Sequence, residues 1–468
     1  MAFGLIQIPH DKNDGKQLTQ YLAVISASFA VFTVGIYQGW SSPSLIKIFS
    51  DEYPIDVTDE EASYITIIGN IGHVFAGFLA SYLSDRIGRK STMLAIAIPQ
   101  ILSFGLIYMS FYSKTLLYIS RVLGGMGEGA VIAILPCYIG EIADSNVRGT
   151  LGAFIGVVLT LGIIFINVIG SLLTIHEVAL VCHIFPIIFW LTFIGMPESP
   201  YYCLMKEDKD GAKLSIQMLR RKQSVDKEIL QLSSDVNRQM SETGTFKDLF
   251  AIQSNCKAFL LVAAARFFQA FSGIGAIRSY NQMIIAQTTN FSPLIGSTII
   301  LSANLIMMLI SSWYIDKIGR KPMFVISAFL TFLIHFSQGI FLTIQDYTSV
   351  DLSQCSWVPL LTIIACNLTF AGGLGPGVNV FIGEIFSTSI KAKAMSACSF
   401  VFALSYMSSI KVYQYTNDNV GTAVPFYIFG TTTLIGAGFF AFVLPETRGK
   451  PLEVIQQELK GNVVEWKV

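Results

Sequence analysis

Long apolar runs separated by short polar segments fill most of the chain. Each run has about 20 residues, the length at which a helix spans the hydrocarbon core of a bilayer. The runs begin near residues 21, 62, 92, 116, 150, 177, 257, 292, 323, 357, 394 and 423. We therefore predict an all-α integral membrane protein with twelve transmembrane helices. The first run follows four charged residues and is too long for a cleaved signal peptide, so we expect it to remain as a helix.

Composition agrees with this pattern. Only 13% of the 468 residues are charged and 53% are hydrophobic, whereas soluble domains carry about 25% charged residues. The formal net charge is zero, so nothing suggests a nucleic-acid partner. The seven cysteines fall mostly within apolar runs and show neither a disulfide framework nor metal-ligand spacing. We expect no cofactor, no metal and no enzymatic constellation of nucleophile and base.

Lysine and arginine fix the expected orientation. With both termini in the cytoplasm, cytoplasmic segments hold 25 of the 31 basic residues, as the positive-inside rule requires. We divide the chain into a cytoplasmic tail (1–20), a six-helix half (21–196), a cytoplasmic linker (197–256), a second six-helix half (257–444) and a second tail (445–468). In the linker, apolar residues from Val225 to Met240 recur at helical spacing. Amphipathic helices that cover the bundle are therefore expected, although a partner-binding role stays open.

Three short phrases occur twice, once in each half and in the same order. IGRK stands at 87–90 and 318–321, IGEI at 139–142 and 382–385, and PESP at 197–200 is matched by PETR at 445–448. Each copy lies at the expected cytoplasmic end of a span, which indicates a duplicated six-helix unit. Membrane proteins built from two such repeats include transporters, whose substrate site lies between the halves and opens alternately to each side. An acid also stands four residues before each repeated arginine, at Asp85 and Asp316.

These motifs make the chain resemble the sugar porter family of the major facilitator superfamily along nearly its whole length. Within that family it looks most like the insect facilitated trehalose transporters. The text that carries the resemblance is SDRIGRK (84–90), RVLGGMGEG (121–129), PCYIGEIADSNVRG (136–149), PESP (197–200), IDKIGRK (315–321), GEIF (383–386) and PETRGKPLE (445–453). The resemblance implies a cytoplasmic gate, a ring of charge pairs that holds the outward-open state. Its members here would be Asp85, Arg89, Glu141, Arg148, Glu198, Asp316, Arg320, Glu384, Lys391, Glu446 and Arg448.

The expected sugar site matches the family less well. The resemblance implies sugar contacts at Gln269 and Asn304. We also predict Asn379, which stands at the position of a usual tryptophan, Glu128 and Arg266 as substrate-binding residues. The amides of Gln269 and Asn304 could instead be ordinary contacts between helices. Glu128 and Arg266 are unusual intramembrane charges, and such charges are costly and are functional candidates by default. They could pair with each other, Glu128 could be neutral, or they could mark a site changed for a charged or proton-coupled solute.

The function that follows is facilitative transport of trehalose or a hexose by alternating access. Residues 21–44 contain no Asp or Glu, whereas proton-driven sugar porters carry an acid in that helix. The alternatives are a porter of the same fold for another polyol or a charged solute, and a non-transporting sugar sensor. We expect a monomer in the cell membrane whose partners are the sugar and the lipid bilayer. Asn290 begins a glycosylation sequon, Asn-Phe-Ser, in an outer loop.

Overall fold

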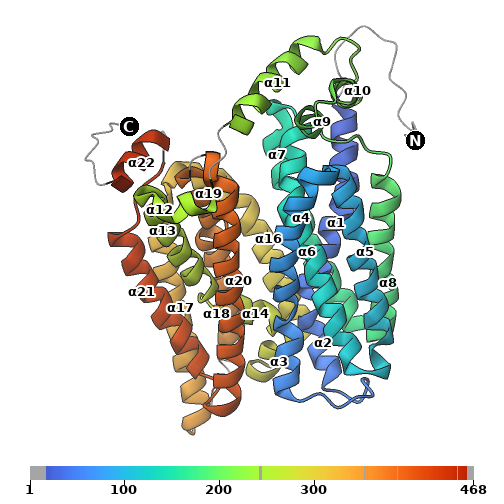
Figure 1. Cartoon of the computed structure of the whole chain (residues 1–468). Helices are drawn as coiled ribbons and strands as arrows, with labels where there is room; N and C mark the ends of the chain where they lie inside the picture. Colours follow the sequence, from blue (N-terminus) through green and yellow to red (C-terminus); the bar gives the residue numbers. More distant parts are fainter. Residues whose placement is uncertain are drawn as a thin grey trace. The chain divides into compact units, whose positions relative to one another are not determined.

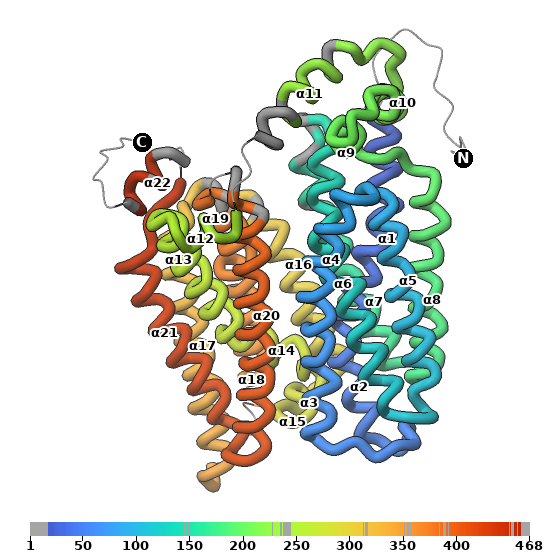
Figure 2. Tube along the Cα trace, in the orientation of Figure 1, coloured from blue at the N-terminus to red at the C-terminus, as the bar shows by residue number. Residues whose placement is uncertain are grey.

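The computed structural model describes residues 17–241, 245–350, 352, 355, 357–386, 388–448, 450 and 452–460. These residues form helices and contain no strand (Figures 1 and 2). The chain divides into two compact units. Unit 1 comprises Met1–Trp40, Lys47–Asp56 and Tyr64–Thr243, and unit 2 comprises Ser41–Ile46, Val57–Ser63 and Gly244–Val468.

Unit 1 contains the first six apolar runs and most of the linker. Its helices are α1 (Leu18–Gly39), α4 (Gly69–Ile87), α5 (Arg89–Tyr108), η1 (Met109–Tyr112), α6 (Lys114–Ile142), α7 (Ser145–Leu172), α8 (Ile175–Phe193), α9 (Pro200–Met205), α10 (Lys209–Arg220) and α11 (Asp226–Ser241). Two short helices, α2 (Ser41–Ile48) and α3 (Asp59–Ile67), contribute residues to both units.

Glycines of the RVLGGMGEG run allow α4 and α6 to pack closely. A Cβ atom added at Gly125 would lie 1.9 Å from the carbonyl oxygen of Gly69, and one added at Gly129 would lie 2.0 Å from that of His73. No side chain fits at such distances. The glycines therefore allow the two helix backbones to approach closely, as small residues do between helices in a membrane. The run is therefore a helix-packing surface within unit 1.

Unit 2 contains the last six apolar runs. Its helices are α12 (Phe246–Ala251), α13 (Gln253–Ala270), α14 (Ile274–Ser279), α15 (Asn281–Thr288), α16 (Pro293–Ile318), α17 (Arg320–Tyr347), α18 (Val358–Thr369), the π-helical segment η3 (Phe370–Leu374), α19 (Gly375–Ile385), α20 (Thr388–Asn419), α21 (Val424–Phe442) and α22 (Leu452–Lys460).

Eleven helices of the described residues are long and apolar enough to cross a membrane, against the twelve predicted. The seventh run is the exception, because it is divided into α13, α14 and α15. Gly273 begins α14 with a positive φ of 80°, a conformation that favours glycine. The ring of His335 hydrogen-bonds the freed carbonyl of Ser272 at 2.8 Å. The break therefore has its own backbone and side-chain support.

The linker is shared between the units and does not form a separate domain. Helices α9, α10 and α11 belong to unit 1, and α12 belongs to unit 2. The stretch predicted to be an amphipathic helix lies largely in α11. Its Val236 is buried against Cys203 of α9, with Ile229 and Leu232 packed beside it. Burial in this small core raises the pKa of the Cys203 thiol to about 11.

Candidate functional site

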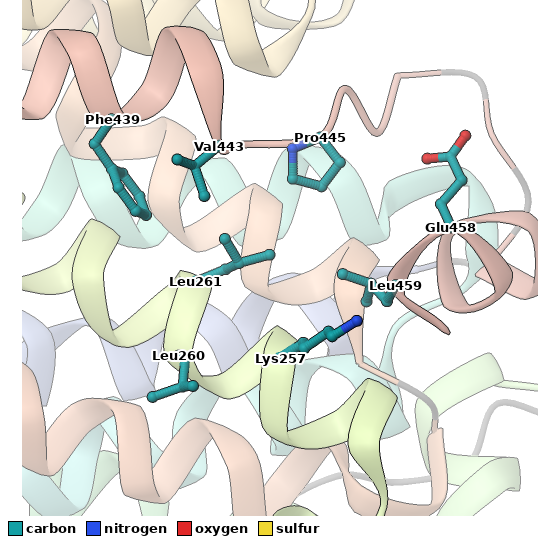
Figure 3. Close-up of a pocket in the computed structure, with 8 residues that line it drawn as sticks. All are labelled: Lys257, Leu260, Leu261, Phe439, Val443, Pro445, Glu458 and Leu459. Carbon is teal, nitrogen blue, oxygen red and sulfur yellow. The ribbon is translucent and has the colours of Figure 1, made fainter. Parts of the chain in front are cut away.

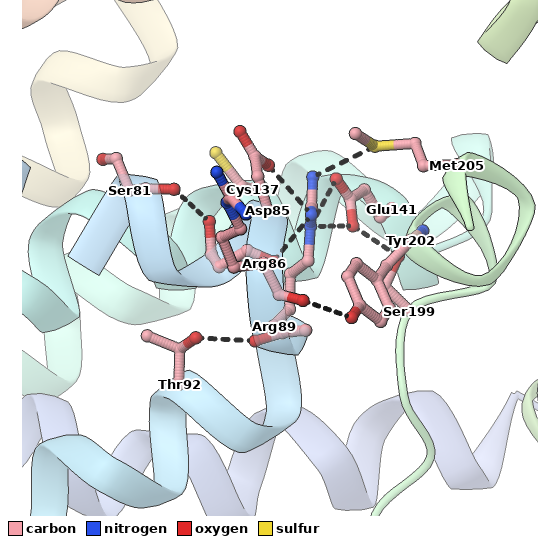
Figure 4. Close-up of polar contacts among 12 residues, drawn as sticks. Ser81, Asp85, Arg86, Arg89, Thr92, Cys137, Glu141, Ser199, Tyr202 and Met205 are labelled. Carbon is pink, nitrogen blue, oxygen red and sulfur yellow. Dashed lines mark hydrogen bonds and ion pairs between the residues drawn. The ribbon is translucent and has the colours of Figure 1, made fainter. Parts of the chain in front are cut away.

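The first polar cluster of unit 1 surrounds Arg89, the first residue of α5, and we call it the Arg89 cluster (Figure 4). The Arg89 Nε atom lies 3.1 Å from Oε2 of Glu141 on α6. Its Nη1 atom lies 3.0 Å from Oδ1 of Asp85, one turn earlier on α4. Ser199 donates its hydroxyl to the same Glu141 carboxylate. Arg89 is 8% exposed and Glu141 15%, so this ion pair is shielded from solvent.

Glu198 has a different role in this cluster. Its carboxylate accepts hydrogen bonds from the backbone N–H groups of Arg89, at 3.0 Å, and Lys90, at 3.0 and 3.1 Å. These groups begin α5 and have no partner within the helix, and an acid there also complements the helix dipole. Gly88 precedes them with φ of 101°. A Cβ atom at Gly88 would lie 2.3 Å from Oε2 of Glu198, so glycine leaves room for the cap.

Unit 2 repeats this arrangement around Arg320, the first residue of α17, in what we call the Arg320 cluster. The Arg320 Nη2 atom lies 2.6 Å from Oε1 of Glu384. Thr447 donates its hydroxyl to Oε2 of Glu384 at 2.6 Å. Glu446 accepts the backbone N–H groups of Arg320 and Lys321, each at 3.1 Å. Gly319 precedes them with φ of 96°. The two halves thus share a cap, an ion pair and a hydroxyl contact.

The structure changes the roles that the sequence suggested for some members of the charge ring. Glu198 and Glu446 cap backbone N–H groups at the starts of α5 and α17. The exposed Arg448 donates its backbone N–H to Glu446 at 2.8 Å, and Lys391 is half-buried on α20. The side chains of Arg148 and Asp316 lie outside the described residues. The sequence did not lead us to predict the hydroxyl contacts of Ser199 and Thr447, although a hydroxyl residue directly follows the glutamate in both PESP and PETR.

A second polar cluster of unit 1 ties the linker to the bundle. Arg220 on α10 lies 2.8 Å from Asp144 and 2.8 Å from Glu228. It also donates to the carbonyl oxygen of Ile142 at 2.8 Å. Gln20 of α1 donates to Asp144 at 2.9 Å and accepts its backbone N–H at 3.0 Å. The linker is therefore attached to α1 and to the α6–α7 connection, a contact that no repeat in the sequence signalled.

Glu128 on α6 has partners within unit 1. Gln38 of α1 donates its amide to Oε1 of Glu128 at 2.7 Å. The Nδ1 atom of His73 on α4 lies 3.5 Å from the same oxygen. Glu128 is 13% exposed, and these contacts satisfy part of a carboxylate that would otherwise be costly inside a membrane.

Arg266 on α13 joins two of the predicted sugar contacts in unit 2. Its Nη1 atom donates to Oε1 of Gln269 and its Nη2 atom to Oδ1 of Asn379, each at 2.8 Å. Gln269 in turn donates its amide to the carbonyl oxygens of Leu374 and Gly375, at 2.8 and 3.1 Å. These two carbonyl groups belong to the last residue of the π-helical segment η3 and to the first residue of α19. Gln269 thus satisfies backbone groups between helices, and its amide is already used.

Asn304 on α16 differs from Gln269. It is 6% exposed, and its Nδ2 atom is buried without a hydrogen-bond partner among the described residues. A buried amide left without a partner is costly. This donor is therefore available to a ligand oxygen.

An apolar pocket of about 430 Å³ lies between α13, α21 and α22 (Figure 3). Leucine, valine, proline and phenylalanine side chains form most of its wall, with Lys257 and Glu458 as its charged residues. Lys450 already pairs with Glu458 at 2.5 Å. A sugar needs many hydrogen-bonding groups around its ring, and this pocket does not offer them. Among the described residues, no group of three or more His, Cys, Asp or Glu side chains has the arrangement of a metal site.

Comparison with known proteins identifies the family. Residues 23–459 match the Sugar (and other) transporter family. The chain belongs to this family. The facilitated trehalose transporter Tret1 of Aedes aegypti is 31% identical over 452 residues, which cover 95% of this chain and 56% of that protein. Tret1 of Culex quinquefasciatus is 30% identical over 458 residues, covering 95% of this chain and 86% of that protein. The chain thus spans little more than half of the first relative.

Solved structures show the fold. The inward-open xylose transporter XylE from E. coli superposes with a TM-score of 0.77 at 20% identity, over 94% of this chain and 99% of that one. The POT family transporter PepTSo gives a TM-score of 0.64 at 12% identity, over 96% of this chain and 99% of that one. The predicted major facilitator fold is therefore confirmed, and so is the predicted membership of the sugar transporter family.

Proposed function

We propose that this member of the sugar transporter family is a facilitative carrier for trehalose or a hexose that works by alternating access. The observation that carries the proposal is the likeness to facilitated trehalose transporters at about 30% identity over 95% of this chain. Helix α1 contains no Asp or Glu, whereas proton-driven sugar porters carry an acid in this helix. Uptake therefore runs down the sugar gradient.

The Arg89 and Arg320 clusters form the cytoplasmic gate in this proposal. Each places an arginine, a glutamate and a capped helix start on one cytoplasmic turn. The exposed member Asp85 is 61% exposed, and surface pairs contribute only about 0–1 kcal/mol. A pair of this size, such as Arg89 with Asp85, can break and form again during each cycle.

The sugar itself contacts Asn304 in this proposal, because its Nδ2 atom is a buried donor without a hydrogen-bond partner among the described residues. Gln269, Asn379 and Arg266, which belong to the same unit as Asn304, act as the polar surroundings of that contact. Glu128 of unit 1 stays a predicted substrate contact. The protein is a transporter and not an enzyme, and it is a monomer in the cell membrane with both termini in the cytoplasm. Asn290, which is exposed between α15 and α16, then lies outside the cell and carries a glycan.

A panel of radiolabelled sugars tests this function. Purified full-length protein in proteoliposomes is preloaded with trehalose, glucose, fructose or a polyol, and entry of the labelled counterpart is followed. Facilitative transport predicts saturable exchange for at least trehalose or one hexose, above the rate of empty vesicles. Exchange of a polyol but of no sugar would contradict the proposed substrate class, and exchange of nothing in the panel would contradict the proposed function.

A further inference from the structure

Arg266 is a cation inside the predicted seventh span, and its partners in unit 2 are neutral. Its two hydrogen bonds go to the amide oxygens of Gln269 and Asn379. Its Nε atom is buried and has no hydrogen-bond partner among the described residues. None of the described carboxylates of unit 2 forms an ion pair with it. Two of the five guanidinium N–H groups are therefore used, and no carboxylate among the described side chains of unit 2 balances their charge.

The surroundings of Arg266 give it access to a solute. Asn379 is exposed and Arg266 is half-buried. The Phe402 ring lies 5.2 Å from the guanidinium carbon and forms an apolar wall on one side. A charged side chain within a transmembrane segment faces the bundle interior or a water-filled cavity, because exposure to hydrocarbon is too costly. The exposed side of the Arg266–Asn379 pair therefore faces the solute pathway.

Arg278 adds a second cation to the same divided span. It lies on α14, and its guanidinium carbon is 5.5 Å from the centre of the Phe370 ring in η3. The described carboxylates of unit 2 form no ion pair with Arg278 either. The same η3 segment ends at Leu374, which accepts the amide of Gln269. Arg278 thus contacts η3 directly, and Arg266 is linked to it through Gln269. Two cations near this segment make this part of unit 2 attractive to an anion.

We propose that Arg266 and Asn379 bind the carboxylate of a sugar acid, so that the transporter accepts hexuronates as well as neutral sugars. Guanidinium groups bind carboxylates with short, charge-assisted hydrogen bonds. Asn379 holds Arg266 through Oδ1, which leaves its Nδ2 atom as a second donor. The sugar ring then uses the contacts proposed for the neutral substrate. This inference rests on the proposed function, because the acid enters by the same carrier.

The wild-type protein alone gives the first test. Exchange of labelled glucose or trehalose is measured against rising concentrations of glucuronate, its neutral amide glucuronamide, and glucose. We expect glucuronate to inhibit at a concentration about tenfold or more below that of glucuronamide, since a hydrogen bond to a charged group contributes about 1.5–3 kcal/mol. Equal inhibition by the acid and its amide would overturn the inference. The two compounds would also inhibit equally if another charge of the protein neutralised Arg266, and the inference would then be wrong as well.

Three variants assign the effect to Arg266. Arg266→Gln should raise the inhibitory concentration of glucuronate about tenfold or more relative to those of glucose and glucuronamide measured in the same variant. Arg266→Lys keeps the charge and should retain most of the preference for the acid. Lys257→Gln removes one positive charge from the same helix, beside the apolar pocket, and should behave as wild type. Equal loss of acid preference in Lys257→Gln and Arg266→Gln would overturn the assignment.

The inference and the proposed function fail in different ways. If glucose or trehalose exchanges and glucuronate does not compete, the inference is wrong and the function stands. If labelled glucuronate exchanges but no neutral sugar does, the proposed carboxylate contact stands and the neutral substrate class is wrong. If none of these exchanges, both are wrong. A glucuronate-induced rise in the melting temperature of detergent-solubilised Arg266→Lys but not Arg266→Gln supports the assignment independently of transport.

Discussion

Gly88 and Glu198 show how one residue without a side chain and one carboxylate define the start of a helix. Gly88 turns the chain with a positive φ, and Glu198 receives the first N–H groups of α5. Gly319 and Glu446 do the same for α17. The repeat IGRK therefore has a structural reason beyond its positive charge. Its glycine makes room for an acid that arrives from a distant part of the chain.

Gly88→Ala should destabilise the protein more than Gly319→Ala. Gly88 and Gly319 combine a positive φ with ψ near 160°, a conformation that costs a non-glycine residue about 1–3 kcal/mol. The new Cβ would also lie 2.3 Å from Glu198 at position 88, but 2.9 Å from Glu446 at position 319. Melting temperatures of the purified proteins in detergent measure this order. Gly438→Ala is the control, because its Cβ meets nothing within 4 Å. A fall for Gly438→Ala as large as for Gly88→Ala would contradict the cap.

Asn304→Ala and Gln269→Ala should fail in different ways. Asn304 offers a free donor, so its loss should weaken sugar affinity about 2- to 10-fold, as expected for one hydrogen bond of about 0.5–1.5 kcal/mol. Its melting temperature should change little. Gln269→Ala leaves the carbonyls of Leu374 and Gly375 without their donor, at a cost of about 1–3 kcal/mol in stability. Exchange kinetics and melting curves separate the two, and the reverse pattern would contradict the assignment.

At the scale of the element, the divided seventh span and the linker are where the structure departs most from a row of uniform helices. Hydrophobic periodicity predicted spans from residues 257 and 357, but it could not show that Gly273 divides the first of them or that η3 interrupts the second. Such breaks are tolerated at membrane depth where other groups satisfy the freed polar atoms. Here His335 satisfies Ser272, and Gln269 satisfies Leu374.

The attachment of the linker to unit 1 can be tested at Arg220. Arg220→Gln removes the ion pairs to Asp144 and Glu228, so α10 should separate from the bundle more often. Trypsin should then cut faster after Arg221 and Lys222 in the folded protein. Lys213→Gln is the matched control on the same helix, because its pair with Asp226 is exposed, at 45% and 69%, and contributes only about 0–1 kcal/mol. Equal cutting of both variants would show that Arg220 does not hold α10.

At the scale of the whole molecule, the duplication explains which features could be predicted. Membrane spans and the six-plus-six division follow from residues adjacent in sequence, so apolar runs and repeats revealed them. The sequence predicted both ion pairs, Arg89 with Glu141 and Arg320 with Glu384, because the repeated motifs contain both partners of each pair. The caps made by Glu198 and Glu446 involve backbone atoms, which leave no pattern of side chains to read. The partners of Arg266 could not be predicted, because helices α13 and α19 meet only in the folded unit.

The most direct test of the central claim is whether sugar entry is passive. Full-length protein in proteoliposomes is given labelled trehalose or the hexose that it exchanges, at acidic and at neutral outside pH, with and without a protonophore. Because α1 carries no acid, we predict entry that stops at the outside concentration and does not respond to the protonophore. Accumulation above the outside concentration that collapses when the protonophore is added would contradict facilitative transport.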